Sequence, residues 1–184
     1  MYTMPNPPVD TLAGNPPASL SDAHWYAIYT RSRFEKKVHH DLEKSNFQVF
    51  LPLIKVKKKW SDRMKTVSEP LLPSYVFVKL ERQSIPRLNY YPGIVRLVTF
   101  DRKPCRVREE EIQLLEQITT HGINVQQAVH CEIGDKVRIV QGPLKGWEGN
   151  VEARKGQSRI VFQIASILQC ISVEVSMGEV EKVR

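Results

Sequence analysis

The pattern of hydrophobic and polar positions divides the chain into two parts of different character. In the first part, alternating apolar residues predict strands at 24–30, 47–51 and 94–98. Apolar residues at helical spacing lie between these strands and again after the last of them. From residue 134 onward, the pattern indicates only short strands and glycine-rich turns. Segregated helices and strands followed by a separate β unit predict an α+β fold with two domains.

The stretch from Ser68 to Leu80 has the strongest strand signal. Pro70 and Pro73 disfavour a helix, and residues 75–80 carry apolar side chains on both faces of the expected strand. A strand that is apolar on both faces is typical of the centre of a sheet. The alternative is that the face with Leu72, Tyr75 and Phe77 lines an apolar pocket for a partner. The pattern by itself leaves both interpretations open.

Two helices and one hairpin complete the first part. Phe34, Val38 and Leu42 recur at helical spacing, and Ser32 to Glu35 has the spacing of a capping box that would open this helix. A second helix is expected over 108–118, where three glutamates match the positive end of the helix dipole. The hairpin is expected over 53–68 around a turn at 61–63.

Composition sets the expected domain boundaries. Residues 1–23 are rich in proline with little to bury and predict a disordered leader, and 24–118 form the first domain. Residues 119–131 lack periodicity and are interpreted as a linker. The short strands within 132–184 predict a small SH3-like β-barrel.

Positive charge is concentrated in one segment. The formal net charge is +7, and residues 29–65 hold eleven Lys and Arg against four acidic residues. The rest of the chain has equal numbers of basic and acidic residues. This segregation is expected if one face of the first domain meets a polyanion, and the alternative is a solvated surface.

No catalytic constellation is found in the sequence. The three cysteines are far apart and show no metal-site spacing, so reduced thiols in a cytoplasm are expected. No metal, no cofactor and no enzymatic activity are expected, because motifs for metal binding, nucleophilic catalysis and phosphate binding are all missing. No secretory signal and no apolar run of the ~20 residues that a membrane helix needs are present.

Four segments together resemble one known family. The first three are WYAIYTR at 25–31, PLLPSYVFV at 70–78 and GIVRLV at 93–98, and they look like the N-terminal domain of the NusG family. The fourth, GDKVRIVQGPLKGWEGNV at 134–151, looks like the KOW barrel of that family. The resemblance implies an antiparallel NusG N-terminal (NGN) sheet flanked by helices, followed by a KOW SH3-like β-barrel.

The resemblance also implies a function and its partners. NusG-like proteins bind RNA polymerase, dock an apolar depression on the clamp helices of its β′ subunit, and suppress pausing and termination. The positions that match this depression are Tyr29, Leu72, Tyr75, Phe77, Leu97 and Phe100. A basic patch beside it would contact the non-template DNA strand or nascent RNA, and its matching positions are Arg31, Arg33, Lys36 and Lys37. A cytoplasmic monomer is implied, whose KOW domain contacts a ribosomal protein or Rho.

Within the family, residues 67–73 resemble the specialised RfaH and UpxY paralogues, which implies antitermination at specific operons such as those for capsular polysaccharide. A matching interdomain salt bridge would join Glu69 to Arg159. In RfaH, the KOW domain has a helical form, and residues 159–168 are apolar enough to fit either a helix or a strand. Their β-branched content favours a strand.

Two alternatives to a specialised regulator are a housekeeping NusG-type elongation factor and a general KOW RNA-binding module. The second would place its basic face on the barrel, whereas residues 132–184 are nearly neutral, with eight basic and seven acidic residues.

Overall fold

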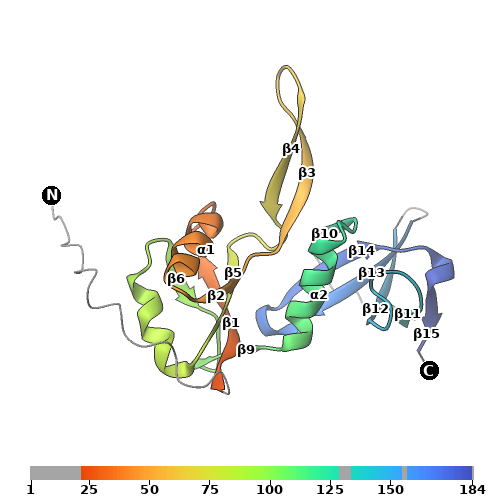
Figure 1. The fold of residues 1–184 in the computed structure, drawn as a ribbon. Helices are drawn as coiled ribbons and strands as arrows, with labels where there is room; N and C mark the ends of the chain where they lie inside the picture. The colour runs from red at the N-terminus through yellow and green to blue at the C-terminus, as the bar shows by residue number, and fades with distance from the viewer. Residues whose placement is uncertain (1–21, 129–133, 155–156, 184) are drawn as a thin grey trace.

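The computed structural model of the chain describes residues 22–128, 134–154 and 157–183. All but the last two residues of the expected leader lie outside this range. The described residues form an α+β structure in which helix α2 (Glu109–Thr120) lies between two antiparallel sheets (Figure 1).

The first sheet has the strand order β2-β5-β1-β6, and β9 also pairs with β1. Its central strands pair in register from His24 opposite Leu80 to Tyr29 opposite Tyr75. The expectation that the stretch before Leu80 forms a central strand is therefore confirmed. The strands of this sheet are β1 (His24–Thr30), β2 (Gln48–Phe50), β5 (Tyr75–Leu80), β6 (Ile94–Leu97) and β9 (Arg106–Val107).

The two faces of this sheet belong to two different apolar clusters. Helix α1 (Glu35–Lys44) covers one face, where Val38 and Leu42 pack with Ile28 and Val76. The other face carries Phe77, which joins a cluster that continues into α2 and the second sheet. Because side chains alternate along a strand, each of the two central strands contributes to both clusters.

Three shorter elements surround the first sheet. Strands β3 (Leu53–Lys59) and β4 (Met64–Pro70) form a two-stranded ribbon that projects from the body (Figure 1). A 3₁₀ helix, η3 (Arg82–Tyr90), follows β5, and Pro86 lies within it. Strands β7 (Thr99–Phe100) and β8 (Lys103–Pro104) form a small hairpin.

The second sheet has six strands in the order β10-β14-β13-β12-β11-β15. Residues 159–164 are in a strand, as their β-branched content predicted, and not in a helix. Its strands are β10 (Val125–Ala128), β11 (Lys136–Ile139), β12 (Glu148–Arg154), β13 (Gln157–Ile164), β14 (Gln169–Glu174) and β15 (Val180–Lys182). Two 3₁₀ turns interrupt it, η4 (Ala165–Ile167) and η5 (Met177–Glu179).

The expected linker at 119–131 is corrected by the structure. Helix α2 continues to Thr120, and Val125–Ala128 form β10 at the edge of the second sheet. Val125 is buried, and β10 pairs with β14 from Val125 opposite Val173 to Ala128 opposite Cys170. Edge-strand pairing uses backbone groups, so this strand forms without the side-chain alternation that would reveal it in the sequence. Residues 129–131 lie outside the described range.

The expectation of three reduced cysteines is also corrected. Cys105 is free, whereas Cys170 is disulfide-bonded, and Cys131 lies outside the described residues. Among the described residues, no helix has the length and apolar character that a membrane span requires.

Gly149 allows β12 and β13 to approach closely, and this gives a prediction for stability. A Cβ at Gly149 would lie 2.4 Å from Ile160 Cγ2 and 2.8 Å from the Val161 carbonyl oxygen. We expect Gly149→Ala to lower the free energy of unfolding by about 1–3 kcal/mol, because the neighbouring backbone cannot shift without disturbing the sheet. Denaturant unfolding measures this change.

Gly178→Ala is the matched control, because nothing lies within 4 Å of a Cβ at that position. It is expected to leave stability unchanged or to raise it by a few tenths of a kcal/mol. Equal stabilities for the two variants would contradict the close approach at Gly149.

Candidate functional site

The candidate site is the face of the first sheet opposite α1. Tyr29 of β1 and Tyr75 of β5 are neighbours in register, and their rings meet edge to face with centroids 5.4 Å apart. Phe77 lies two residues further along the same face and stacks on Phe50 of β2. Phe77 and Leu72 are fully buried, whereas Tyr29 and Tyr75 are half-buried. The structure thus brings together four of the six predicted apolar site residues.

Leu97 and Phe100 do not belong to this group. Leu97 pairs with Ile28 in the sheet register, so its side chain points to the α1 face and joins the other apolar cluster. The register shifts between Tyr29 and Thr30, and a shift of this kind decides which face each side chain occupies. Phe100 lies in the β7–β8 hairpin and is 69% exposed.

Charged and polar groups surround the two tyrosines. The Arg96 guanidinium lies 5.3 Å from the centroid of the Tyr29 ring, because Arg96 pairs with Tyr29 in the sheet. Burial raises the pKa of Tyr75 above its ordinary value, and Tyr29 raises it further. Arg96 and a hydrogen bond with Gln169 act in the opposite direction on the same pKa. No pattern in the sequence singles out Arg96 or Gln169.

The second sheet covers this face. Gln169 begins β14, and its contact with Tyr75 places that strand beside the tyrosine pair. Ile164 and Ile167 are buried in the apolar cluster that contains Leu72 and Phe77. Residues far apart in the sequence therefore share one core, and the predicted pocket is closed by the chain's own second part.

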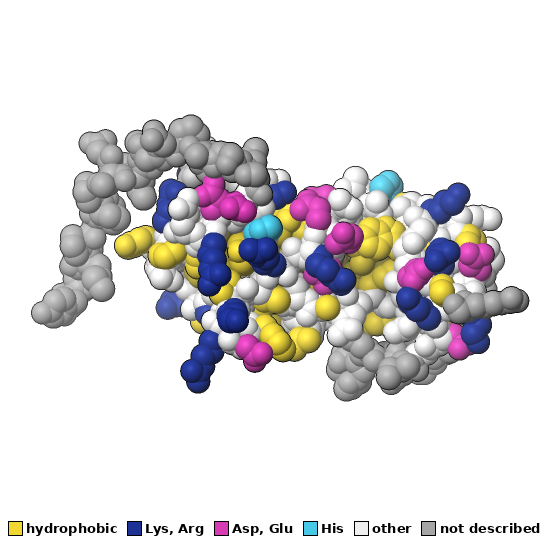
Figure 2. Space-filling view, turned by 90° about the horizontal axis from the view of Figure 1, so that it is seen from below, with side chains coloured by type: hydrophobic (Ala, Val, Ile, Leu, Met, Phe, Trp, Pro, Cys, Tyr) yellow, Lys and Arg dark blue, Asp and Glu magenta, His cyan; other side chains and the backbone are white. Residues whose placement is uncertain are grey.

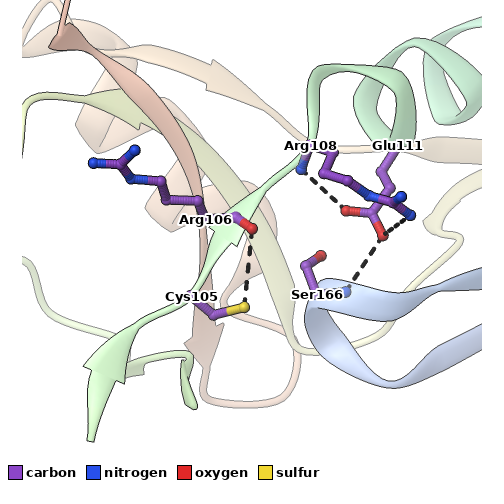
Figure 3. A network of polar contacts seen from close by, with 5 residues as sticks. All are labelled: Cys105, Arg106, Arg108, Glu111 and Ser166. Atoms are coloured by element: carbon purple, nitrogen blue, oxygen red, sulfur yellow. Dashed lines mark hydrogen bonds and ion pairs between the residues drawn. The ribbon is translucent and has the colours of Figure 1, made fainter. Parts of the chain in front are cut away.

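Two hydrogen bonds from α2 hold the second sheet in this position. The buried Glu111 carboxylate accepts hydrogen bonds from the backbone N–H of Ser166 at 3.3 Å and from that of Arg108 at 3.1 Å (Figure 3). Near the other end of the helix, Trp147 Nε1 donates to Gln117 Oε1 at 2.7 Å. The glutamates at 109–111 were explained by the helix dipole alone, and the tertiary role of Glu111 was missed.

The predicted basic patch is exposed. Arg31 and Arg33 lie in the turn after β1, and Lys36 and Lys37 lie in the first turns of α1. Lys36 Nζ donates to the Ser68 carbonyl oxygen at 2.6 Å, which joins this patch to the base of the β3–β4 ribbon. On the face seen in Figure 2, by contrast, Lys and Arg are interspersed with acidic and hydrophobic side chains.

The capping box expected at Ser32 to Glu35 is not formed. Phe34 is the N-cap residue and provides no side-chain hydrogen bond, and Glu35 is the first residue of α1. The buried Glu35 carboxylate instead accepts a hydrogen bond at 2.8 Å from the backbone N–H of Ser74. This bond fixes the turn that leads into β5, where Ser74 has a positive φ of 66°. Glu35 therefore positions Tyr75 indirectly, a role that the capping-box spacing does not predict.

The predicted salt bridge between Glu69 and Arg159 is wrong for this structure. Glu69 pairs with Lys58 within the β3–β4 ribbon. Arg159 is buried in the second sheet, where it donates to Ser172 Oγ at 2.7 Å and lies 3.7 Å from the Glu174 carboxylate. Each charge finds a partner on the adjacent strand of its own sheet. Arg159 is directly opposite Glu174 in the register, whereas Glu69 is opposite Ile54 and is reached by the long side chain of Lys58 along the ribbon.

The described residues offer little for catalysis. Within 22–128, 134–154 and 157–183, no group of three or more His, Cys, Asp or Glu side chains could hold a metal ion. Burial raises the pKa of the Cys105 thiol, and the Glu111 carboxylate raises it further. A raised thiol pKa is the opposite of what a nucleophilic cysteine needs, because the thiolate is the reactive form.

The position of Glu111 predicts a local effect on the closed face. We expect Glu111→Ala to speed amide hydrogen exchange at residues 164–169, because the Ser166 N–H loses its acceptor in a buried site, at a cost of about 1–3 kcal/mol. Hydrogen exchange read by mass spectrometry measures this change. Glu110→Ala is the control, since Glu110 is exposed and lies next to Glu111 in the same helix. Equal exchange in the two variants would show that Glu111 does not hold the second sheet.

Comparisons with known proteins agree with this geometry. The NusG family model, described as transcription termination factor NusG, matches residues 23–116, just over half of the chain. The "Transcription termination/antitermination protein NusG" of Helicobacter pylori (strain J99) is 26% identical over 175 residues, covering 86% of this chain and 98% of the relative. The protein of the same name from Neisseria meningitidis serogroup B is 29% identical over 180 residues, covering 86% and 97%.

A solved structure supports the fold. The structure described as "Domain interaction in Thermotoga maritima NusG" covers 90% of this chain and all of its own, with a TM-score of 0.59 at 20% identity. The family model, the sheet with α1 on one face, and relatives that align along nearly their whole length lead to one conclusion: the chain belongs to the NusG family.

Proposed function

We propose that this protein is a transcription factor that binds RNA polymerase through the face carrying Tyr29, Leu72, Tyr75 and Phe77. The observation that carries the proposal is the pair of half-buried tyrosines at the edge of a buried apolar face. That face is closed by a part of the chain distant in sequence, and not by the first sheet's own helix α1. The relatives' names support a role in termination and antitermination.

The proposed contact is with the clamp helices of the β′ subunit, and the basic patch from Arg31 to Lys37 would contact the non-template DNA strand or nascent RNA. A protein that holds both the clamp and the nucleic acid bridges the polymerase cleft. If it binds the closed clamp more tightly than the open one, it shifts the population of polymerase molecules away from paused and terminating states. The protein acts by binding, as a cytoplasmic monomer without a cofactor, and not as an enzyme.

The second sheet is proposed to be a KOW SH3-like barrel. Its support is the run of short antiparallel strands and the glycine-punctuated turn between β11 and β12, together with the resemblance of 134–151 to the KOW motif. A ribosomal protein or Rho is its proposed partner. A general RNA-binding role for this domain is less well supported, since its charge is nearly balanced.

Within the family, we propose a specialised antiterminator that serves specific operons, such as those for capsular polysaccharide. The support is the resemblance of residues 67–73 to the specialised paralogues, and the relatives' names fit a housekeeping factor equally well. Genome-wide occupancy separates the two: enrichment at one or a few operons supports the specialised role, and occupancy wherever polymerase transcribes supports the housekeeping one.

Polymerase binding is proposed to require that the second sheet leaves the candidate face. Leu72 and Phe77 are fully buried in the same cluster as Ile164 and Ile167, so a partner cannot reach them while this cluster is intact. The equilibrium between closed and open arrangements then sets the apparent affinity, because only the open fraction binds.

Substitution at the tyrosine pair tests the binding face. We expect Tyr75→Asp to abolish co-purification with RNA polymerase, because a carboxylate there must be desolvated against an apolar partner surface. Tyr90→Asp is the matched control, since Tyr90 is 76% exposed in η3 and lies outside the candidate face. Retained binding by a folded Tyr75→Asp protein would contradict the assignment of this face.

Opening the covering contact tests the closed arrangement. Ile167 is 5% exposed and its neighbour Leu168 is 73% exposed, so the same substitution has different consequences at the two positions. We expect Ile167→Asp to raise the affinity for RNA polymerase several-fold, by increasing the open fraction, and Leu168→Asp to leave it unchanged. Affinity is measured by titration with purified core polymerase. An unchanged affinity for Ile167→Asp, with faster hydrogen exchange showing that the contact has opened, would overturn this part of the proposal.

A further inference from the structure

The β3–β4 ribbon lies outside the candidate face and has an unusual surface. It projects from the body as a two-stranded element, and every residue from Lys57 to Thr66 is exposed (Figure 1). At its tip, Trp60 is 56% and Met64 is 61% exposed. Each strand has seven residues, which corresponds to a length of about 24 Å at 3.4 Å per residue.

One face of the ribbon is a ladder of lysines without acids. Lys55, Lys57 and Lys59 alternate along β3, so their side chains share a face, about 6.8 Å apart from one to the next. The residues opposite them in β4 are Ser68, Thr66 and Met64, none of which is charged. Among the residues that the structure describes, no carboxylate forms an ion pair with these three lysines.

The opposite face also carries unbalanced positive charge. Lys58 and Lys65 are directly opposite each other in the register, and like charges in this arrangement destabilise a sheet. Glu69 pairs with Lys58, whereas no carboxylate of a described residue forms an ion pair with Lys65, which lies 5.9 Å from the Trp60 ring. Bound phosphates would relieve this repulsion, because a polyanion supplies the negative charge that the ribbon lacks.

The lysine ladder continues into the basic patch of α1. Lys36 Nζ reaches the carbonyl oxygen of Ser68, the residue opposite Lys55 in the register. A basic track therefore runs from the first turns of α1 to the tip of the ribbon.

We propose that the β3–β4 ribbon binds duplex DNA, with the Lys55–Lys57–Lys59 face on backbone phosphates and the tip, including Trp60, entering the major groove. The major groove is about 12 Å wide and admits a two-stranded β-ribbon. Successive lysines on this face are about 6.8 Å apart, close enough for a row of them to contact the densely spaced phosphates that line the groove. The binding does not depend on RNA polymerase, and it uses ribbon lysines other than the residues Arg31 to Lys37 that are proposed to contact the non-template strand or RNA.

The first test measures the salt dependence of DNA binding by the full chain. The probe is a short fluorescein-labelled duplex of arbitrary sequence, read by fluorescence anisotropy without polymerase. We expect Lys57→Gln/Lys59→Gln to weaken binding and to reduce the slope of log K against log salt by about 1.8, the value for two lost phosphate contacts. Lys145→Gln/Lys182→Gln removes the same charge from exposed positions in the second part of the chain and is expected to keep the original slope. Equal losses in both variants would overturn the proposal.

The second test places the contact at the tip. Of the three tryptophans, Trp25 is buried and Trp147 is bonded to Gln117, so Trp60 is the one whose emission a ligand at the tip would quench. We expect duplex DNA to quench the intrinsic fluorescence and Trp60→Phe to remove the quenching while anisotropy still reports binding. Quenching that persists in Trp60→Phe would overturn the assignment, as would binding to single-stranded DNA or RNA of the same length in preference to the duplex.

Discussion

A single apolar core joins the first sheet, α2 and the second sheet, and the arrangement of the whole chain depends on it. Trp25 and Phe77 enter this core from the first sheet, Leu115 from α2, and Ile164 and Ile171 from the second sheet. Burial of one such side chain contributes about 1.5–3 kcal/mol, whereas a typical hydrogen bond contributes about 1 kcal/mol. Contacts such as that between Glu111 and Ser166 therefore orient the two parts, while apolar burial supplies most of the attraction between them.

This core explains why the candidate binding face and the closing contact are the same surface. A face that is apolar enough to bind a partner is also apolar enough to be covered by another part of its own chain. The polar groups at its edge, including the Tyr75 hydroxyl and Gln169, keep their hydrogen bonds in the closed arrangement. Under the proposed function, polymerase binding and the closing contact use one set of side chains, so the second sheet and the polymerase compete for the same buried area.

The basic β3–β4 ribbon, unlike the two sheets, has few contacts with the shared core. The β3–β4 ribbon is anchored only at its base, where Ile54 packs against the shared core and Leu53 pairs with Pro70. Beyond this base, the ribbon is held by its own cross-strand bonds, and its lysine face lies outside the shared core. Charge and apolar surface are therefore separated in space, so the protein can contact a polyanion and a protein partner independently.

Local patterns in the amino-acid sequence are enough to predict the strands and their faces, because side-chain alternation and β-branched content are local properties. The assignment of Tyr75 and Phe77 to one face and Val76 and Val78 to the other follows from the two-residue repeat of a strand. The same local reasoning placed the helices, the hairpin and most strands of the second sheet. The grouping of Tyr29, Leu72, Tyr75 and Phe77 into one site came from the resemblance to a known family and not from local patterns.

What lies against each face depends instead on contacts between distant segments. Leu97 lies on the α1 face because it is paired with Ile28, which packs in that cluster, and no pattern within β6 reveals this pairing. Glu69 and Arg159 found partners within their own sheets, and Val125–Ala128 became an edge strand through backbone bonds to β14. The roles of Glu35 and Glu111 depend on backbone N–H groups 39 and 55 residues away. Such contacts form between distant segments, so they become determined only when the shared core brings those segments together.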